Sequence, residues 1–231
     1  MPFLFRRCLA EALGTFALVF IGAGSVMSTT FPNSGYGMLG IAIAHGLVLA
    51  VMVSSTMAIS GGHLNPAVTI GLLVTRRGNP TSAAAYIAAQ LIGAILAALL
   101  LKVLYPAGVG KALALGTPTI ASSISLTQAI GLELVFTFFL VSAVFGTCVH
   151  PDAPKVGGFG IGLVLVFDII MGGPLTGAAM NPARAFGPAL VSGQWVGQIA
   201  YWIGPLLGGI LAGLVWEYLL LPRASERRTA D

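Results

Sequence analysis

The sequence predicts an all-α membrane protein with six transmembrane helices and two half-helices in an inverted repeat. Three observations predict this fold. Of the 231 residues, 57% are hydrophobic and only 8% are charged, with a mean hydropathy of +0.95, whereas a soluble domain is about one-quarter charged. Six apolar runs are long enough to cross the hydrocarbon core of a bilayer. The tripeptide Asn-Pro-Ala interrupts apolar sequence twice, once in each half of the chain.

The six apolar runs, taken in chain order, define the expected transmembrane helices. They are Cys8–Met27, Gly37–Ile59, Ser82–Leu104, Leu126–Val149, Gly157–Pro174 and Gln198–Leu221. The first run carries Glu11 and lacks a small-residue cleavage site, so we expect a retained helix rather than a signal peptide. Little sequence is left for a soluble domain, and residues 1–231 are therefore expected to form one domain.

Basic residues predict the orientation of these helices. In a six-span chain, eight of them fall on the side of the two chain ends: Arg6, Arg7, Arg76, Arg77, Lys155, Arg223, Arg227 and Arg228. Three fall on the opposite side: Lys102, Lys111 and Arg184. Cytoplasmic loops carry the excess of Lys and Arg, so both termini are expected in the cytoplasm of an integral protein of the plasma (cell inner) membrane. The pI near 9.4 then reflects contact with anionic lipid headgroups. No basic-aromatic patch indicates nucleic acid.

The two halves of the chain resemble each other. Three correspondences occur in the same order: Ile59–Thr69 with Leu175–Ala185, Tyr86–Leu99 with Tyr201–Leu214, and Glu11 and Thr15 with Glu133 and Thr137. Three spans per copy invert the second copy relative to the first, so that broken helices meet near the bilayer midplane. We expect repeat 1 at about residues 8–104, a linker at 105–125, repeat 2 at about 126–221 and a tail at 222–231.

Each Asn-Pro-Ala tripeptide is expected to begin a short helix, because Asn is a favoured N-cap and Pro a favoured first helical residue. The two motifs are Asn65, Pro66 and Ala67, and Asn181, Pro182 and Ala183. If each Asn oxygen accepts from its own helix, its NH2 group points into a lumen as a donor. A water molecule between the two amides can then only accept, which breaks the hydrogen-bonded chain that proton transfer needs. The positive ends of both half-helices oppose cations.

The segments before the two motifs are rich in small residues. We expect extended backbone there, with carbonyl groups that replace the hydration shell of a permeant molecule; the residues are Gly61, Gly62, His63, Gly177 and Ala179. Acceptors along the path and donors at its centre suit a pore for water that excludes protons and ions.

These motifs carry a resemblance to a known family. From Glu11 to about Leu221 the chain resembles the aquaporins of the major intrinsic protein superfamily, on the strength of Ser60–Thr69 and Asn181–Pro188 at mirrored positions. The resemblance implies a right-handed bundle of six spans and two half-helices, assembled as a homotetramer with one pore per protomer. We expect no cofactor and no metal.

The resemblance also implies a selectivity filter of four residues: His45, Ile169, Ala178 and Arg184. Strict water channels usually carry Phe in place of His45 and His in place of Ile169. This combination is more similar to plant tonoplast aquaporins, some of which pass ammonia or urea. The motif at Asn181 is not followed by Asp, which is unlike the glycerol facilitators. We therefore expect a passive water channel, with a broader channel for ammonia, ahead of urea or glycerol, as the alternative.

Several residues have structural alternatives to a role in the pore. The alternative for Arg184 is a loop residue that anchors an outer surface, but an arginine inside a membrane half-helix is costly without a role. His45 alone would indicate a hydrogen-bonded interior histidine, and His63 is expected both to brace the loop and to line the pore. Glu11 and Glu133 are expected to be buried acceptors for loop backbone rather than permeation residues. Asp168 is expected to be structural.

Other readings remain open. His150 and Asp152 suggest either a pH gate or, more simply, a solvated loop. Cys8 and Cys148 lie near the cytoplasmic ends of their spans, where we expect no disulfide. An inverted-repeat secondary transporter would share the broken helices but needs an ionisable pair for ion coupling, for which Asp168 is the one candidate. A structural junction protein would not need His45 and Arg184 around an open lumen. No nucleophile-base or metal-ligand pattern indicates an enzyme.

Overall fold

The computed structural model describes residues 3–222, and over this range its regular elements are helical. Six long helices carry the bundle: α1 (Phe3–Ser28), α2 (Gly37–Ser60), α4 (Pro80–Leu104), α6 (Leu126–Val144), α7 (Phe159–Thr176) and α9 (Ala200–Val215). The turns η2 (Phe145–Val149) and η3 (Trp216–Leu220) extend α6 and α9. With these extensions, all six are long and apolar enough to cross a membrane, which confirms the predicted six-span fold. The predicted tail from residue 223 onward lies outside the described residues.

Most helix boundaries agree with the apolar runs to within a few residues, and the differences have local causes. The third long helix, α4, begins at Pro80 rather than Ser82. The Asn79 side chain accepts a hydrogen bond from the Ser82 N–H at 2.8 Å, and Pro80 occupies the first helical position. Helix α1 begins at Phe3 rather than Cys8, since the two arginines before Cys8 are good helix formers even though they are not apolar.

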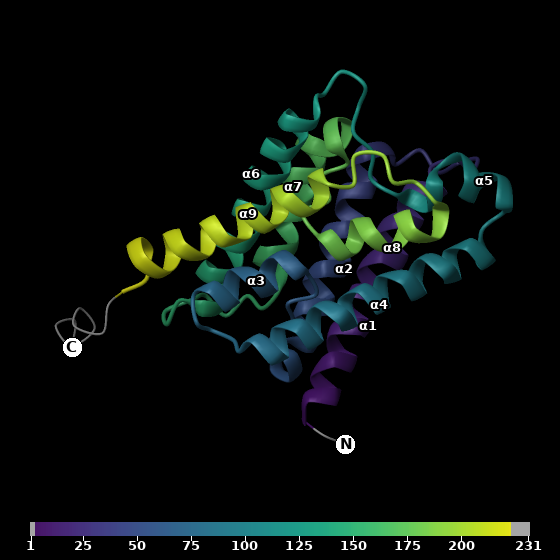
Figure 1. The fold of residues 1–231 in the computed structure, drawn as a ribbon. Coiled ribbons are helices and arrows are strands. Elements are labelled where there is room, and N and C mark those ends of the chain that lie inside the picture. Colours follow the sequence, from purple (N-terminus) through teal and green to yellow (C-terminus); the bar gives the residue numbers. More distant parts are fainter. Residues whose placement is uncertain (1–2, 223–231) are drawn as a thin grey trace.

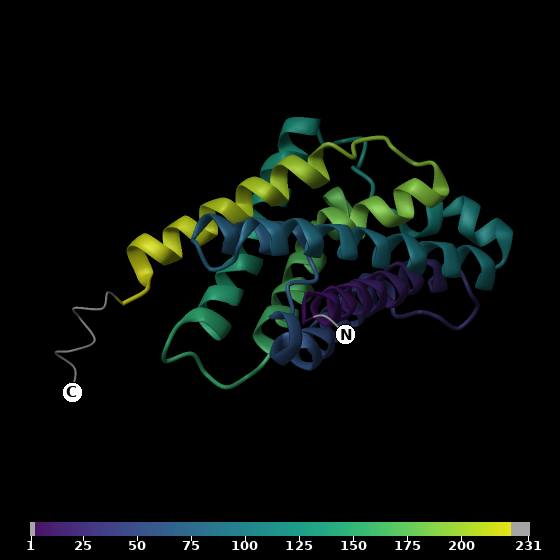
Figure 2. The same ribbon diagram turned by 60° about the horizontal axis from the view of Figure 1, so that its bottom comes forward.

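Two half-helices, α3 (Pro66–Val74) and α8 (Pro182–Ser192), lie roughly end to end in the middle of the molecule (Figure 1). Each one packs against a long helix of the other half: α3 packs on α9, and α8 packs on α4. Helix α1 runs beside α4 in both ribbon views (Figures 1 and 2), and α6 packs on α9 in the same way. The two halves are thus interlocked through their half-helices.

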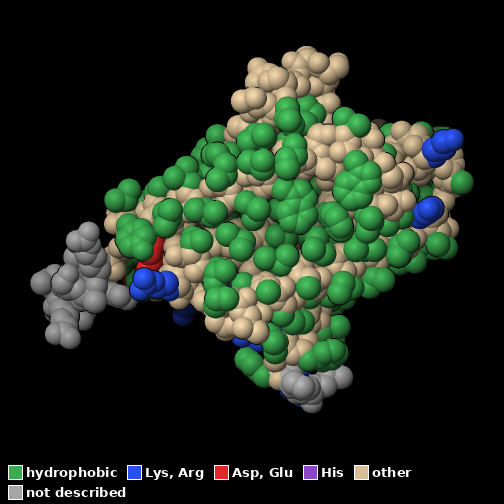
Figure 3. All heavy atoms as spheres, viewed as in Figure 1, with side chains coloured by type: hydrophobic (Ala, Val, Ile, Leu, Met, Phe, Trp, Pro, Cys, Tyr) green, Lys and Arg blue, Asp and Glu red, His purple; other side chains and the backbone are tan. Residues whose placement is uncertain are grey.

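Close packing of the long helices depends on paired glycines. A Cβ at Gly93 would clash with the carbonyl group of Ala12, and a Cβ at Gly208, the matching position in the second half, would clash with the carbonyl group of Leu134. Small residues let two helix backbones approach in this way. Hydrophobic side chains are spread over the face of the molecule seen in Figure 3, and Lys and Arg side chains lie near its edges. Such a surface suits lipid.

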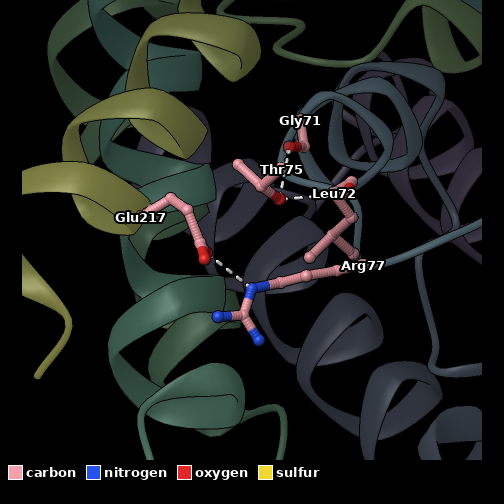
Figure 4. A network of polar contacts seen from close by, with 5 residues as sticks. All are labelled: Gly71, Leu72, Thr75, Arg77 and Glu217. Atoms are coloured by element: carbon pink, nitrogen blue, oxygen red, sulfur yellow. Dashed lines mark hydrogen bonds and ion pairs between the residues drawn. The ribbon is translucent and has the colours of Figure 1, made fainter. Parts of the chain in front are cut away.

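The C-terminal end of α3 is tied to the end of the last span. Arg77 Nε donates to Glu217 Oε2 at 2.8 Å (Figure 4). The Arg77 guanidinium also lies 5.9 Å from the centre of the Phe145 ring. Nearby, the buried hydroxyl of Thr75 donates to the carbonyl groups of Gly71 and Leu72 at 3.2 and 3.0 Å. These contacts close α3 and join it to η3.

Candidate functional site

Both half-helices begin at the Asn of an Asn-Pro-Ala motif. Asn65 and Asn181 have extended backbone, with φ of −157° and −146°. Asn65 Oδ1 accepts from the N–H of Ala67 at 2.8 Å. Asn181 Oδ1 accepts from Ala183 and Arg184 at 3.0 and 3.2 Å. Pro66 and Pro182 fill the first helical positions, where no N–H is needed.

The amide groups of the two asparagines cross-link the halves. Asn65 Nδ2 donates to the carbonyl group of Met180 at 2.8 Å, and Asn181 Nδ2 donates to the carbonyl group of Leu64 at 2.9 Å. Each NH2 group carries two hydrogens, so one hydrogen is used between the halves and one is left. The sequence predicts instead that the whole NH2 group of each asparagine points into the lumen. The difference arises because Leu64 and Met180 have positive φ, 51° and 52°, which turns their carbonyl groups toward the opposite asparagine.

The fully buried carboxylate of Glu11 binds the loop before α3. Glu11 Oε1 accepts from Ser60 Oγ at 2.6 Å and from the N–H of His63 at 3.0 Å. Glu11 Oε2 accepts from the N–H of Leu64 at 2.6 Å and from Gln90 Nε2 at 2.8 Å. Four donors therefore converge on one side chain of α1.

Glu133 of α6, also fully buried, repeats this arrangement in the second half. Its Oε1 accepts from Thr176 Oγ1 at 2.7 Å and from the N–H of Ala179 at 3.0 Å. Its Oε2 accepts from the N–H of Met180 at 2.7 Å. In both halves a carboxylate holds the loop backbone that leads to the half-helix.

A narrow central cavity passes the starts of both half-helices. Both motif asparagines line it together with His63 and Arg184. Its other wall is apolar and comes from the long helices: Leu18, Leu49, Leu140, Val144, Ile161 and Leu165. The space open to the centres of water molecules is about 20 Å³, compared with about 10–15 Å³ for one water. The cavity is therefore narrow on the scale of a single water molecule.

The loop residues predicted to present carbonyl groups have different positions in the structure. Gly62, His63 and Ala179 line the central cavity. Gly177 lines an adjoining cavity on the linker side, next to Thr117 and Pro118. Gly61 is the left-handed C-cap of α2 (φ 96°), where its N–H donates to the carbonyl group of Met57 at 3.0 Å.

The four predicted filter residues come together. His45, Ile169, Ala178 and Arg184 all line the central cavity, and all but Ala178 also line the adjoining one. The Arg184 guanidinium is buried, and its Nη1 atom donates to the carbonyl group of Gly116 at 3.0 Å. Arg184 Nη2 lies 3.3 Å from His45 Nε2.

Sequence reasoning missed the contribution of the linker to this ring. Residues 105–125 are not a plain linker, because they contain the short helix α5 (Ala107–Ala112) and the turn η1 (Ala114–Gly116). Gly116 has φ of 70°, and Leu115 before it has φ of 54°. A glycine can adopt such a conformation readily, but nothing in the sequence indicates that its carbonyl group accepts from Arg184.

The remaining candidates lie away from the central cavity. Asp168 is 2% exposed and lines a groove of about 730 Å³ between α6 and α7, and within residues 3–222 its Oδ2 has no hydrogen-bond partner. His150 Nδ1 accepts from the N–H of Asp152 at 3.1 Å in the loop after η2. Cys8 and Cys148 are free thiols. Across the described range, no cluster of three or more His, Cys, Asp or Glu residues is able to hold a metal ion.

Six spans surround two half-helices whose capped ends meet at a narrow cavity with polar groups on one wall, and this arrangement defines a membrane channel. The family model described as Major intrinsic protein matches residues 2–216, and the chain belongs to this family. As a member of this family it is a channel and not an enzyme. The predicted resemblance is confirmed.

Curated relatives narrow the resemblance to the tonoplast type. Aquaporin TIP4-4 of Zea mays is 46% identical over 229 residues, which cover 96% of this chain and 89% of that protein. Probable aquaporin TIP3-2 of Arabidopsis thaliana is 40% identical over 242 residues, covering 97% and 87%. Among solved structures, the X-ray structure of the aquaglyceroporin from Plasmodium falciparum is similar with a TM-score of 0.82 at 26% identity, covering 94% of this chain and 97% of that one.

Proposed function

We propose that this chain is a passive water channel that excludes protons and ions. The observation that carries the proposal is the meeting of Asn65 and Asn181 at one narrow cavity beside Arg184. Each asparagine has one amide hydrogen left for the cavity after its bond to the opposite half. Two donors from opposite halves orient a water molecule so that it accepts at this point, and a proton then has no continuous chain of hydrogen bonds to follow.

Cation exclusion follows from charge. The N-terminal ends of α3 and α8 carry the positive ends of their helix dipoles and face the same cavity. Arg184 adds a full positive charge at the narrow ring. Carbonyl groups of Gly62, His63 and Ala179 are the acceptors that guide neutral, hydrogen-bonding solutes along the path. The carboxylates of Glu11 and Glu133 serve this path indirectly, because they hold the loop backbone in place.

The test is osmotic flux in proteoliposomes. Purified protein is expected to give rapid water flux with a low activation energy in stopped-flow light scattering, without proton conductance. Ile169→Trp fills the ring and is expected to abolish the flux. The matched control is Leu163→Trp, on the exposed face of the same helix, which is expected to leave it unchanged. Flux that depends on an ion gradient contradicts the proposal and favours a coupled transporter.

Ammonia is the second candidate permeant. Two of the four filter side chains, Ile169 and Ala178, are apolar, so this ring binds water less tightly than a fully polar ring does. A neutral solute such as ammonia is less strongly hydrated than an ion, and it therefore passes such a ring more readily than an ion does. The ratio of ammonia to water permeability in the same proteoliposomes measures this, and a ratio equal to that of protein-free liposomes removes ammonia as a permeant.

We also propose a homotetramer with one pore per protomer. The groove between α6 and α7 contains the Oδ2 atom of Asp168, which has no partner in the described part of the chain. Lipid tails supply no hydrogen-bond donor, whereas a neighbouring protomer does. Native mass spectrometry in mild detergent is expected to give four copies per particle. A monomeric particle under conditions that preserve water flux contradicts the tetramer but not the channel.

The chain is an integral multi-pass membrane protein. Its relatives carry tonoplast-type names, so the plasma membrane expected from the sequence gains no support from them. We retain cytoplasmic termini as a proposal, because Arg6, Arg7, Arg76 and Arg77 fall on the same side of a six-span chain. Protease accessibility of tags at both ends in sealed vesicles tests it.

A further inference from the structure

The filter contains a histidine whose two ring nitrogens both contact the protein. His45 Nδ1 lies 2.9 Å from the carbonyl oxygen of Ile41, one turn earlier in α2. His45 Nε2 lies 3.3 Å from Arg184 Nη2. A carbonyl oxygen only accepts, so Nδ1 carries the ring hydrogen; a guanidinium only donates, so Nε2 accepts. The contacts therefore define a neutral ring in a single tautomer.

The position of this ring is also limited by its surroundings. His45 is 3% exposed. A Cβ at Gly22 of α1 would lie 2.5 Å from His45 Nε2 and 2.6 Å from its Cδ2. The ring thus rests directly against the backbone of α1 and has no room to turn away from Arg184 on that side.

Arg184 is held from two directions. Its Nη2 atom reaches His45 in α2, and its Nη1 atom donates to the carbonyl group of Gly116 in the linker. Gly116 in turn lies on α1, since a Cβ there would be 2.7 Å from the carbonyl oxygen of Ala23. Two acceptors from separate parts of the chain therefore fix one planar guanidinium, which has five N–H donors in all.

We propose that His45 is a positioning residue for Arg184 rather than a donor to the permeant. His45 accepts from the guanidinium and sets where it stands at the ring. With both nitrogens engaged, the imidazole presents only carbon atoms to the lumen. Because Ile169 and Ala178 are apolar, Arg184 is then the one filter side chain that donates to a solute. The consequence for selectivity rests on the proposed channel function, whereas the tautomer and the contact do not.

The first experiment reads the tautomer directly. Solid-state NMR of the full-length protein in lipid, labelled with ¹⁵N at histidine, resolves protonated from unprotonated ring nitrogens. The chain has three histidines, and the spectrum of His45→Gln assigns the His45 signals by their loss. We expect an unprotonated Nε2 at His45 whose signal shifts in Arg184→Gln. A protonated Nε2 overturns the proposal, and this result is independent of any transport measurement.

The second experiment separates positioning from direct contact by a double-mutant cycle on water permeability in proteoliposomes. His45→Leu removes the acceptor and is expected to lower water permeability about fivefold, the effect of one lost hydrogen bond. His45→Gln keeps an acceptor and is expected to stay within about twofold of the unaltered protein. In an Arg184→Gln background, His45→Leu is expected to change permeability less than about twofold, since there is no guanidinium to position.

Either of two results overturns the positioning role. One is an equal effect of His45→Leu in both backgrounds, which indicates that the ring acts on the solute without Arg184. The other is a loss in His45→Gln as large as that in His45→Leu. Circular dichroism and size-exclusion profiles of each variant establish that it is folded before its permeability is compared.

Discussion

Leu64 and Met180 are the residues at which backbone geometry sets the centre of the pore. Both have φ near 50°, a conformation that costs a non-glycine residue about 1–2 kcal/mol. Each is held there by hydrogen bonds at both of its backbone polar groups: its N–H donates to Glu11 or Glu133, and its carbonyl group accepts from the asparagine of the other half. The two strained residues thus turn the loop so that each half caps and cross-links the other.

Asn65→Asp tests the donor at this centre. Asp keeps the oxygen that caps α3, but it removes the bond to Met180 and adds a negative charge at the cavity. Cation conductance is expected to rise about tenfold or more, because one charge close to the permeant is worth several kcal/mol at an effective dielectric constant of about 20. Ion flux in proteoliposomes measures it.

The matched control is Asn79→Asp, since Asn79 caps α4 at an exposed position away from the cavity. It is expected to leave ion flux unchanged. Equal conductance in the two variants would show that the charge acts through general destabilisation rather than at the pore.

Glu133→Gln tests the buried carboxylate. Three donors converge on Glu133. The substitution replaces one of its acceptor oxygens by an NH2 group, which then faces another hydrogen-bond donor. Bonds to charged groups contribute about 1.5–3 kcal/mol each, so the free energy of unfolding is expected to fall by about 3 kcal/mol or more. Thermal unfolding in detergent measures the loss. Glu217→Gln, in an exposed ion pair, is expected to cost less than about 1 kcal/mol, and an equal loss in both variants contradicts this account of Glu133.

At the scale of elements, helix contacts made through glycine are the least tolerant of change. Gly93→Ala and Gly208→Ala each force a Cβ onto a backbone carbonyl group, so both are expected to lower the unfolding midpoint strongly, with a loss of about 1–3 kcal/mol or more. Gly131→Ala is the control, because no atom of residues 3–222 outside its immediate helix backbone lies within 4 Å of a Cβ at Gly131. It is expected to be neutral or stabilising by up to about 1 kcal/mol. A midpoint for Gly93→Ala equal to that of Gly131→Ala would contradict the close approach.

The elements also show which parts of the fold the sequence predicts. Length and hydropathy predict the six spans, because hydrocarbon demands about twenty apolar residues per helix. The Asn-Pro pair predicts where α3 and α8 begin, because capping is a local property. The turn η1 was not predicted, and neither was the role of Gly116, because a backbone carbonyl group has no sequence signature. The left-handed conformations of Leu64 and Met180 escape prediction for a similar reason: tertiary hydrogen bonds impose them against local preference.

At the scale of the whole molecule, the positions of the thiols predict the response to mercury. Cys148 is exposed and Cys8 is partly exposed, while the central cavity has Ala178 at the ring. Mercuric ion is therefore expected to inhibit water flux only weakly. Ala178→Cys is expected to make the flux mercury-sensitive, and reducing agent is expected to restore it. Strong inhibition of the unaltered protein would place Cys8 or Cys148 close to the path.

The packing of each half-helix on the opposite half has a consequence for biogenesis. Helix α3 ends at Val74, but its partner α9 begins only at Ala200. During cotranslational insertion, α3 therefore lacks its final neighbour until almost the entire chain has left the ribosome. Ribosome-stalled chains that end before Ala200 lack α9, and they should hold five-span precursors with an open, unsealed loop around Asn65. The permeation path is then the last feature of the molecule to mature.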